Sequence, residues 1–314
     1  MKATGQRVRD RVAGLAAALA LAAGGAAAAV AGTPAQATAV PAEHATGTHN
    51  SALAVEAKAS LVRYLKKNRG WNIPAPGGGP HKVTPSTTNL GAGAGGTATL
   101  PSYNWSGYYD SGATGTFTSV SATWAQPTTL CTPEQRLTAF WVGLDGALAT
   151  DQTVEQDGTL AYCFQGQAYY YTWWELFPGS SVTVGSTVQP GDMISASVTR
   201  SGTSYTLSLT DSSTPGNSFS TTQTCAAGTC LDQSAEWIVE RPAFPIGITP
   251  LAYFDVWAPF NASQTANGTN GGIAAGPGAT SVVMVDATDT YPLDNVSGLS
   301  VGGASFTAHW LDSY

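Results

Sequence analysis

Four short segments of this 314-residue chain combine acidic or amide side chains with aromatic ones, and these residues have the clearest chemical potential. They span 141–146, 154–158, 173–178 and 236–240. Side chains on a β-strand point alternately to opposite faces, so each segment divides into two sets. In three segments one set is aliphatic or Trp, and the other pairs carboxylates with apolar, mostly aromatic, side chains. Because an ordinary solvent face carries Ser, Thr and Lys, this pattern predicts a ligand groove on the open side of a sheet.

The alternation assigns individual residues to the two faces of the predicted sheet. The core-facing set contains Val142, Leu144, Trp174, Leu176, Trp237 and Val239. The groove-facing set contains Trp141, Asp145, Trp173, Glu175, Phe177, Glu236, Ile238 and Glu240.

Elimination narrows the chemistry of this groove. His309 is the one histidine after residue 100, and no Gly-x-Ser-x-Gly elbow accompanies it, which argues against a Ser–His–Asp triad. The four cysteines lack paired Cys-x-x-Cys spacing, and no EF-hand loop appears, so we expect no metal and no cofactor. A pepsin-like pair is absent too, because the Asp-Ser-Gly triplet at Asp110 occurs once. Carboxylate, amide and aromatic chemistry remain.

The elements that would position these residues are strands. From Tyr103 onward, short alternating runs rich in Thr, Ser, Val and aromatics are separated by Gly, Pro, Asn or Asp. Examples are 115–124, 192–199, 204–210, 281–286 and 304–310. Many short strands separated by such turn residues predict an all-β fold, an antiparallel β-sandwich of the jelly-roll or concanavalin-like kind.

The N-terminal third has a different composition. Residues 1–37 have a basic start, an Ala/Leu-rich run and an Ala-Gln-Ala triplet, which predicts a signal peptide cleaved after Ala37 and a secreted, extracellular protein. A membrane anchor is the alternative, but the run is mostly Ala and is broken by Gly24 and Gly25. Export permits disulfides, and of three possible pairings we predict Cys131–Cys163 and Cys225–Cys230.

Charge separates the next segment from the body. Residues 38–99 carry six basic and two acidic residues, a net charge of +4, whereas 100–314 carry three arginines and 17 acids, a net charge of −14. The basic segment contains an amphipathic helical pattern (Leu53, Val55, Leu61, Val62 and Leu65) followed by Gly/Pro-rich linkers. We interpret 38–99 as a helical or disordered propeptide that is held by charge attraction and inhibits the body, with a functionless disordered arm as the alternative.

The negative charge of residues 100–314 also argues against some binding partners. It repels nucleic-acid phosphates, so nucleic-acid binding is not expected, and we predict no membrane contact after processing. With few basic groups, the body avoids the positive self-repulsion that drives acid unfolding, which favours work at low pH. We expect a monomer.

Five motifs resemble the glutamic peptidase (eqolisin) family, in the same order and with similar spacing. Residues 104–107 match its Asn-Trp-x-Gly, and 141–146 match Trp-Val-Gly-Ile-Asp-Gly with Leu144 in place of Ile. Residues 155–158 loosely match Leu-Gln-Thr-Gly, and 173–178 match Trp-Tyr-Glu-Trp-Tyr-Pro. Residues 235–240 match Ala-Glu-Trp-Ile-Val-Glu at every position.

The resemblance implies an acid-acting endopeptidase with a Gln and a Glu as its catalytic pair, which map onto Gln156 and Glu240. It implies that protein or peptide chains are the substrates. Trp141, Asp145, Trp173 and Glu175 match positions that line the groove or hold the pair, and Glu236 is expected to support them. The sequence departs from the family pattern at Glu155 and Asp157, which alternation places on the face opposite Gln156.

Two alternatives use the same residues differently. One is a jelly-roll glycoside hydrolase in which two carboxylates such as Glu175 and Glu240 flank a sugar. The other is a non-catalytic lectin-like sandwich in which Trp and Glu side chains bind carbohydrate.

Overall fold

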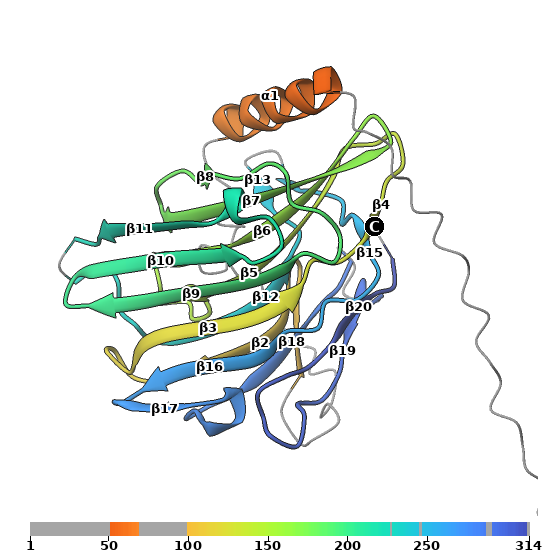
Figure 1. Cartoon of the computed structure of the whole chain (residues 1–314). Helices are drawn as coiled ribbons and strands as arrows, with labels where there is room; N and C mark the ends of the chain where they lie inside the picture. Colours follow the sequence, from red (N-terminus) through yellow and green to blue (C-terminus); the bar gives the residue numbers. More distant parts are fainter. Residues whose placement is uncertain (1–50, 69–98, 227, 245–246, 287–290, 313–314) are drawn as a thin grey trace, which may run out of the picture. The chain divides into compact units, whose positions relative to one another are not determined.

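The computed structural model describes residues 51–68, 99–226, 228–244, 247–286 and 291–312 of the chain. All of them belong to one compact unit, residues 48–314. The predicted signal peptide and most of the predicted propeptide lie outside the described residues. Within the described part, two antiparallel sheets form a sandwich, which confirms the predicted all-β class (Figure 1).

The larger sheet has eight strands in the order β1-β18-β2-β12-β5-β6-β7-β8. Its strands are β1 (Thr99–Ser102), β18 (Thr280–Met284), β2 (Trp105–Ser111), β12 (Ser234–Glu240), β5 (Arg136–Leu144), β6 (Val154–Phe164), β7 (Gln167–Phe177) and β8 (Val182–Thr183). Apart from the parallel pair β1–β18, neighbouring strands run antiparallel. All four segments with chemical potential therefore lie on adjacent strands, β12, β5, β6 and β7.

The smaller sheet has six strands in the order β11-β10-β9-β3-β16-β17. Its strands are β11 (Phe219–Thr224), β10 (Ser204–Asp211), β9 (Met193–Ser201), β3 (Phe117–Ala125), β16 (Phe260–Ala266) and β17 (Thr269–Gly271). Three two-stranded pairs and two short 3-10 turns complete the sandwich: β4 (Thr129–Leu130) with β15 (Tyr253–Phe254), β13 (Ala243–Phe244) with β14 (Gly247–Ile248), β19 (Asp294–Val296) with β20 (Ala308–Trp310), η1 (Pro215–Asn217) and η2 (Ile273–Ala275). The predicted strand over 304–310 is thus confirmed only for its last three residues.

The main core fills the space between the two sheets. It includes Phe140, Val142 and Trp237 from the larger sheet and Val198 and Leu207 from the smaller one. The indole N–H of Trp237 donates a hydrogen bond to the backbone oxygen of Ser121 on β3, 2.9 Å away, and so links the sheets. The predicted core-facing set is confirmed, because these residues all belong to this cluster or pack against it.

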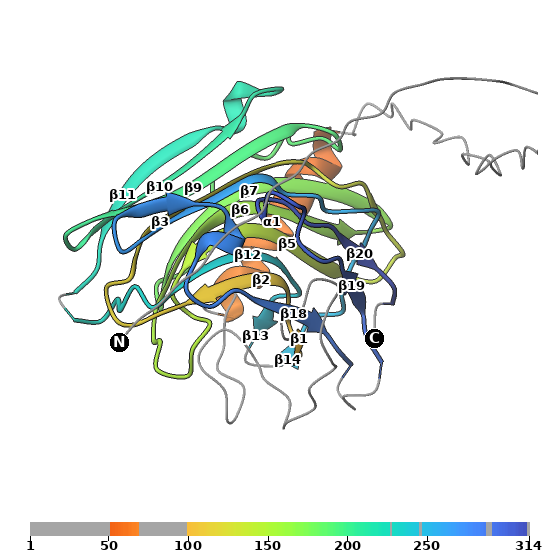
Figure 2. The ribbon, with the colours of Figure 1, turned by 90° about the horizontal axis from the view of Figure 1, so that it is seen from below.

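A second apolar cluster lies on the opposite face of the eight-stranded sheet. It contains Trp105, Trp141, Trp173 and Ile238 together with Ala57 and Leu61 of α1 (Ser51–Asn68). Figures 1 and 2 show α1 on the outer side of the sandwich, across the larger sheet. The predicted helix is therefore confirmed, although Val55 faces outward and is 70% exposed.

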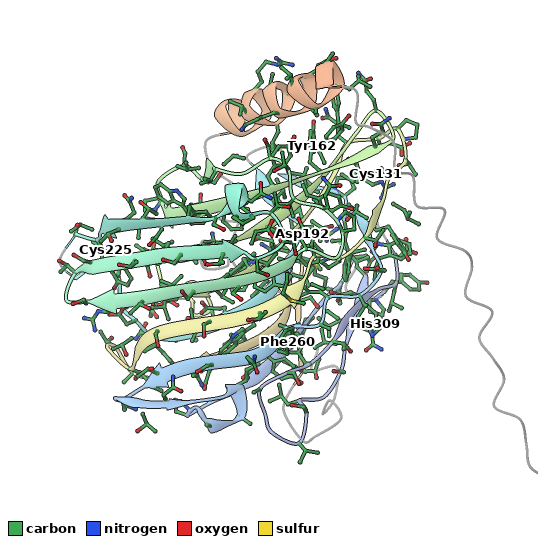
Figure 3. The ribbon with its side chains drawn as sticks, viewed as in Figure 1. Cys131, Tyr162, Asp192, Cys225, Phe260 and His309 are labelled. Carbon is green, nitrogen blue, oxygen red and sulfur yellow. A yellow bond between two sulfur atoms is a disulfide. The ribbon has the colours of Figure 1, made fainter. Side chains whose placement is uncertain are left out.

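Both predicted disulfides are confirmed. Cys131 is bonded to Cys163 and Cys225 to Cys230, and Figure 3 labels Cys131 and Cys225 at opposite ends of the sandwich. In the described part of the chain, no helix has the length and apolar character needed to span a membrane.

Candidate active site

Four neighbouring strands carry the predicted groove residues on one face. Pairing places Gln156 of β6 between Gly143 of β5 and Glu175 of β7. Glu240 of β12 pairs with Ala139 of β5. Gln156 and Glu240 therefore lie on opposite sides of β5, offset by four residues along it. Figure 2 shows that the larger sheet is curved.

Trp141 connects the two sides of the site across β5. Its indole N–H donates a hydrogen bond to Oε2 of Glu240 at 2.9 Å. The far edge of the ring lies over Gly143, since a Cβ at that glycine would be 2.8 Å from Cζ3 of Trp141 and 3.3 Å from Cβ of Gln156. A glycine at position 143 is therefore required for this indole to reach from Gln156 to Glu240.

Gln156 is held by the neighbouring strand. Its Nε2 donates a hydrogen bond to Oε2 of Glu175 at 2.8 Å. Among the described residues, none donates a hydrogen bond to its Oε1. An amide has two N–H groups, so this contact fixes the orientation of the side chain and leaves one N–H and the carbonyl oxygen for a ligand.

Glu240 has donors on both of its oxygens. Besides the Trp141 contact, Nδ2 of Asn104 donates to its Oε1 at 3.3 Å. Burial, together with the nearby negative charge of Glu175, raises the pKa of Glu240 to about 8, against the smaller effects of Trp141, Trp105 and Asn104. The influence of Glu175 shows that the Gln156–Glu175 pair and Glu240 belong to one electrostatic site.

The structure gives Asn104 and Trp105 roles that the sequence interpretation missed. Both lie in the Asn-Trp-x-Gly motif, which was noticed as a resemblance but was assigned no function. The Trp105 ring packs edge-on against Trp141, with centroids 4.9 Å apart. The signal that could have revealed them is the pairing of β2 with β12, which sets Trp105 opposite Glu240.

The remaining predicted residues lie at one end of the groove or beside its centre. Trp173 is buried next to Gly158 in the second cluster. Asp145 accepts backbone N–H groups from Leu231, Asp232 and Gln233 at 2.7–2.8 Å, so it holds the segment that leads into β12. Its function in this structure is to position backbone.

Glu236 occupies the groove face at the Asp145 end. Burial raises its pKa well above the ordinary value, with further contributions from Asp145, Asp151 and Glu155. Within the described residues, neither of its oxygens has a partner of hydrogen-bond geometry. The structure therefore separates Glu236 from the Trp141–Glu240 contact and groups it with the acidic end of the sheet.

The site is closed in the full chain. Gln156, Glu175 and Glu240 are each 0% exposed. α1 covers the neighbouring part of the groove, where Ser60 and Tyr162 are hydrogen-bonded through their hydroxyls at 3.2 Å. A surface hollow of about 410 Å³ lies elsewhere, beside Phe260 and Phe306. A polypeptide substrate cannot reach the site while it is covered in this way.

One group of three side chains in the described part of the chain has the spacing of metal ligands. It consists of Glu155, Cys225 and Cys230. Both sulfurs are joined in a disulfide, so neither is available as a thiolate ligand. The donor set therefore does not fit a metal ion.

Comparisons with known proteins agree with this geometry. A model of the Peptidase A4 family matches residues 103–303. A crystal structure of scytalido-glutamic peptidase with a transition state analog inhibitor is similar at 25% identity, with a TM-score of 0.56, covering 67% of this chain and 98% of that one. SCP-B, an eqolisin in complex with a tripeptide, is similar at 24% identity, with a TM-score of 0.53 and the same coverage. A search of curated protein sequences finds no match.

The family model covers well over half of the chain, and the chain belongs to the Peptidase A4 family. It is a hydrolase of the glutamic endopeptidase type, acting on protein or peptide substrates. This family membership decides against the glycoside hydrolase and lectin-like alternatives.

Proposed function

We propose that this chain hydrolyses peptide bonds in acid with Gln156 and Glu240 as its catalytic pair. The observation that carries the proposal is the bridge formed by Trp141, whose indole is anchored on Glu240 and whose ring lies over Gly143, the residue paired with Gln156. The two groups differ in chemistry: one is a titratable carboxyl and the other an amide that never ionises in the working range.

Each group has a defined task in this mechanism. Ionised Glu240 takes a proton from a water molecule as that water attacks the peptide carbonyl. The carbonyl oxygen of Gln156 orients the water, and the amide N–H that is not bound to Glu175 donates to the developing oxyanion. Protonated Glu240 then passes its proton to the leaving nitrogen. The proton that Glu240 takes from the water is thus the one that it delivers to the leaving nitrogen, and Glu240 is ionised again at the end of the cycle.

The covered site holds Glu240 in the wrong protonation state for this task. With a pKa of about 8, its carboxyl is protonated throughout the acidic range and cannot act as a base. Burial is the largest cause of that shift, so uncovering the groove to water lowers the pKa and returns the carboxylate at acidic pH. Opening the groove is thus required for both access and ionisation.

Two variants test the catalytic pair in the processed protein. We expect Glu240→Gln to abolish measurable cleavage of a denatured protein substrate, and Gln156→Ala to reduce kcat by about 100-fold or more. Glu134→Gln, at an exposed carboxyl that this mechanism does not use, is the matched control and is expected to keep full activity. Circular dichroism checks that each variant is folded. Full activity in folded Glu240→Gln or Gln156→Ala refutes the assignment.

We propose that residues 38–99 act as an inhibitory propeptide. The sequence suggested that charge attraction holds this segment, but the described contact is largely apolar: Ala57 and Leu61 of α1 pack in the cluster with Tyr162, Tyr169 and Tyr171. Burial of apolar area therefore supports the docking of α1, beside the charge attraction that the sequence suggested.

Inhibition in trans separates these two causes. We expect a peptide of residues 38–99 to inhibit the processed enzyme, and the apolar contact predicts that inhibition persists at high salt. Charge attraction alone predicts loss of inhibition as salt screens the +4 and −14 segments. Absence of inhibition at both low and high salt refutes the propeptide proposal.

We also propose that the protein is exported from the cell. The sequence of residues 1–37 supports cleavage after Ala37 and secretion, and the two disulfides are typical of an oxidising compartment. We expect an extracellular monomer that works without a cofactor. Mass spectrometry of the secreted product tests the leader directly, because its first residue is then Thr38 or a later one.

A further inference from the structure

Two carboxyl groups lie inside the sandwich, where the catalytic mechanism does not use them. Glu155 and Asp157 of β6 are both 0% exposed and point away from the groove. On adjacent strands, Glu155 is paired with Leu144 and Leu176, and Asp157 is paired with Val142 and Trp174. All four neighbours belong to, or pack against, the core between the sheets.

Asp157 lacks the partners that a buried carboxylate needs. Among the described residues, neither of its oxygens accepts a hydrogen bond of normal geometry. The backbone of Ser208, on β10 of the opposing sheet, stabilises the carboxylate, but this effect is smaller than the cost of burial. A buried carboxylate without a cation or several donors is strongly unfavourable, whereas the protonated form is tolerated.

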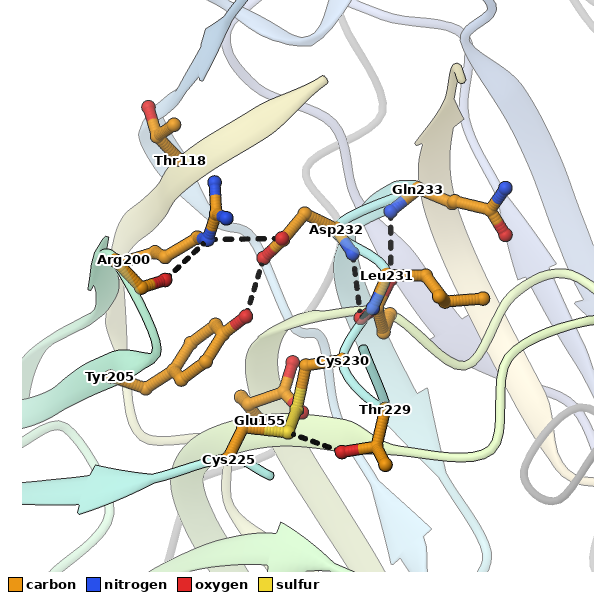
Figure 4. A network of polar contacts seen from close by, with 12 residues as sticks. Thr118, Glu155, Arg200, Tyr205, Cys225, Thr229, Cys230, Leu231, Asp232 and Gln233 are labelled. Carbon is orange, nitrogen blue, oxygen red and sulfur yellow. Dashed lines mark hydrogen bonds and ion pairs between the residues drawn. A yellow bond between two sulfur atoms is a disulfide. The ribbon is translucent and has the colours of Figure 1, made fainter. Parts of the chain in front are cut away.

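Glu155 is in a similar position at the end of the core. Its Oε1 lies 2.9 Å from Sγ of Cys230. That sulfur is bonded to Cys225 and carries no hydrogen, so it donates no hydrogen bond to a carboxylate. Figure 4 shows Glu155 beside this disulfide, with Tyr205, Arg200 and Asp232 nearby.

The charged groups around Glu155 are mostly acidic, and together with burial they outweigh the stabilising effect of the nearby Thr153 hydroxyl. Asp145 follows β5, Asp151 precedes β6, Asp232 precedes β12, and Glu236 lies on β12. From the smaller sheet, Tyr205 of β10 donates a hydrogen bond to Asp232 at 2.7 Å, and Arg200 of β9 pairs with Asp232 at 3.0 Å. The one cation of this network is therefore engaged by Asp232, and Glu155 has none.

We propose that Glu155 and Asp157 form a pH-sensitive lock, which holds the two sheets together while both carboxyls are protonated and opens the sandwich as they ionise toward neutral pH. Both residues depart from the family pattern that the sequence resembles, which has an apolar and a hydroxyl side chain at these positions. It confines the folded, active enzyme to acidic surroundings, independently of the catalytic groups.

The direction of the effect follows from linkage. Burial raises the pKa of both groups well above their ordinary values, and Asp145 contributes further for Glu155. The folded state therefore keeps two protons that the unfolded chain releases as the pH rises above about 4. Stability is thus greatest in acid and falls as the pH rises from the ordinary carboxyl range toward the raised values.

Thermal unfolding of the full chain from pH 3 to 8 tests this proposal. A Gln156→Ala background, in which we expect cleavage to be at least about 100-fold slower, limits self-digestion, and circular dichroism reads the fold rather than the activity. We expect the Tm of the parent to fall steadily above pH 4. The double variant Glu155→Gln with Asp157→Asn replaces each carboxyl by an uncharged group of the same shape, and we expect its Tm at pH 7 to exceed the parent's by roughly 10 °C or more.

Asp312→Asn is the matched control, because Asp312 is an exposed carboxyl, and its profile should follow the parent. A double variant whose Tm falls with pH as steeply as the parent's overturns the proposal. If the double variant does not fold, infrared spectroscopy of the parent beside folded Asp157→Asn decides: at pH 6 the band of protonated carboxyl groups is stronger in the parent, because the variant lacks the Asp157 carboxyl. An equal band in the two folded proteins at pH 6 also overturns the proposal.

Discussion

At the scale of single residues, the site depends on where Glu175 lies relative to Gln156 and Glu240. Glu175 orients Gln156 through a 2.8 Å hydrogen bond, and its charge raises the pKa of Glu240. Removing that charge while keeping the shape of the side chain should therefore affect catalysis in two ways. Gln156 loses a charged acceptor, and Glu240 loses a repulsive neighbour.

Glu175→Gln in the processed enzyme tests this dual role. We expect kcat to fall by about tenfold or more, because Gln156 is held less firmly. We expect the acid limb of kcat/KM to move to lower pH, because Glu240 now ionises more readily. A pH profile with an unmoved acid limb, at any kcat, contradicts the electrostatic link between Glu175 and Glu240.

The sequence was informative about these residues to different degrees. Strand alternation alone placed Glu175 and Glu240 on one face, and the motifs supplied Gln156. Alternation could not show that Asp145 holds the backbone of residues 231–233, because that contact joins segments more than 80 residues apart. Asn104 was missed for the same reason: its contact with Glu240 depends on the pairing of β2 with β12.

At the scale of elements, β5 is the strand on which the site is built. It lies between β12, which carries Glu240, and β6, which carries Gln156. Its groove face alternates Ala139, Trp141 and Gly143, so one large side chain is flanked by two small positions. That pattern gives the indole room to lie along the strand.

Gly143→Ala tests this arrangement. The new Cβ would lie 2.8 Å from Cζ3 of Trp141 and 3.3 Å from Cβ of Gln156. The indole must shift, so we expect a fall in kcat of about tenfold or more, with a loss of stability of about 1–3 kcal/mol. Gly216→Ala is the control, because nothing lies within 4 Å of its added Cβ. Unchanged kinetics in folded Gly143→Ala contradict the role of Trp141 as a bridge.

The elements themselves were largely predictable, and the exceptions have physical causes. Alternation of apolar and polar residues defined β3, β9 and β10 to within a few residues. Alternation failed over 304–307. There the backbone oxygen of Ala304 accepts a hydrogen bond from Ala262 of β16, and the chain pairs with β19 only from Ala308 onward. In α1, helical spacing correctly placed Leu61 in the apolar set, but it also included Val55, which is exposed, and left out Ala57, which makes the contact.

At the scale of the whole molecule, the groove is covered in the full chain. α1 seals one part of the groove through Ala57 and Leu61, and the side chains of the proposed catalytic pair have no exposed surface. The extreme partition of charge along the chain was visible in the sequence. The contact between α1 and the sheet was not visible in the sequence, because it depends on which face of the helix meets Tyr162, Tyr169 and Tyr171.

Substitution on the two faces of α1 tests the cover. Leu61→Asp places a charge in the buried contact, and we expect the unprocessed full chain to gain cleavage activity at least about tenfold, because the helix no longer docks. Val55→Asp adds the same charge on the exposed face and should leave the unprocessed chain inactive. Equal activity of the two variants contradicts a role for α1 in closing the groove.

The most direct test of the central claim is cleavage of a denatured protein substrate by the processed enzyme between pH 2 and 7, in the presence of pepstatin and a chelator, beside Glu240→Gln. The account predicts cleavage in acid that survives both inhibitors and is lost in the variant. Cleavage that pepstatin or the chelator stops, or that folded Glu240→Gln retains, contradicts it.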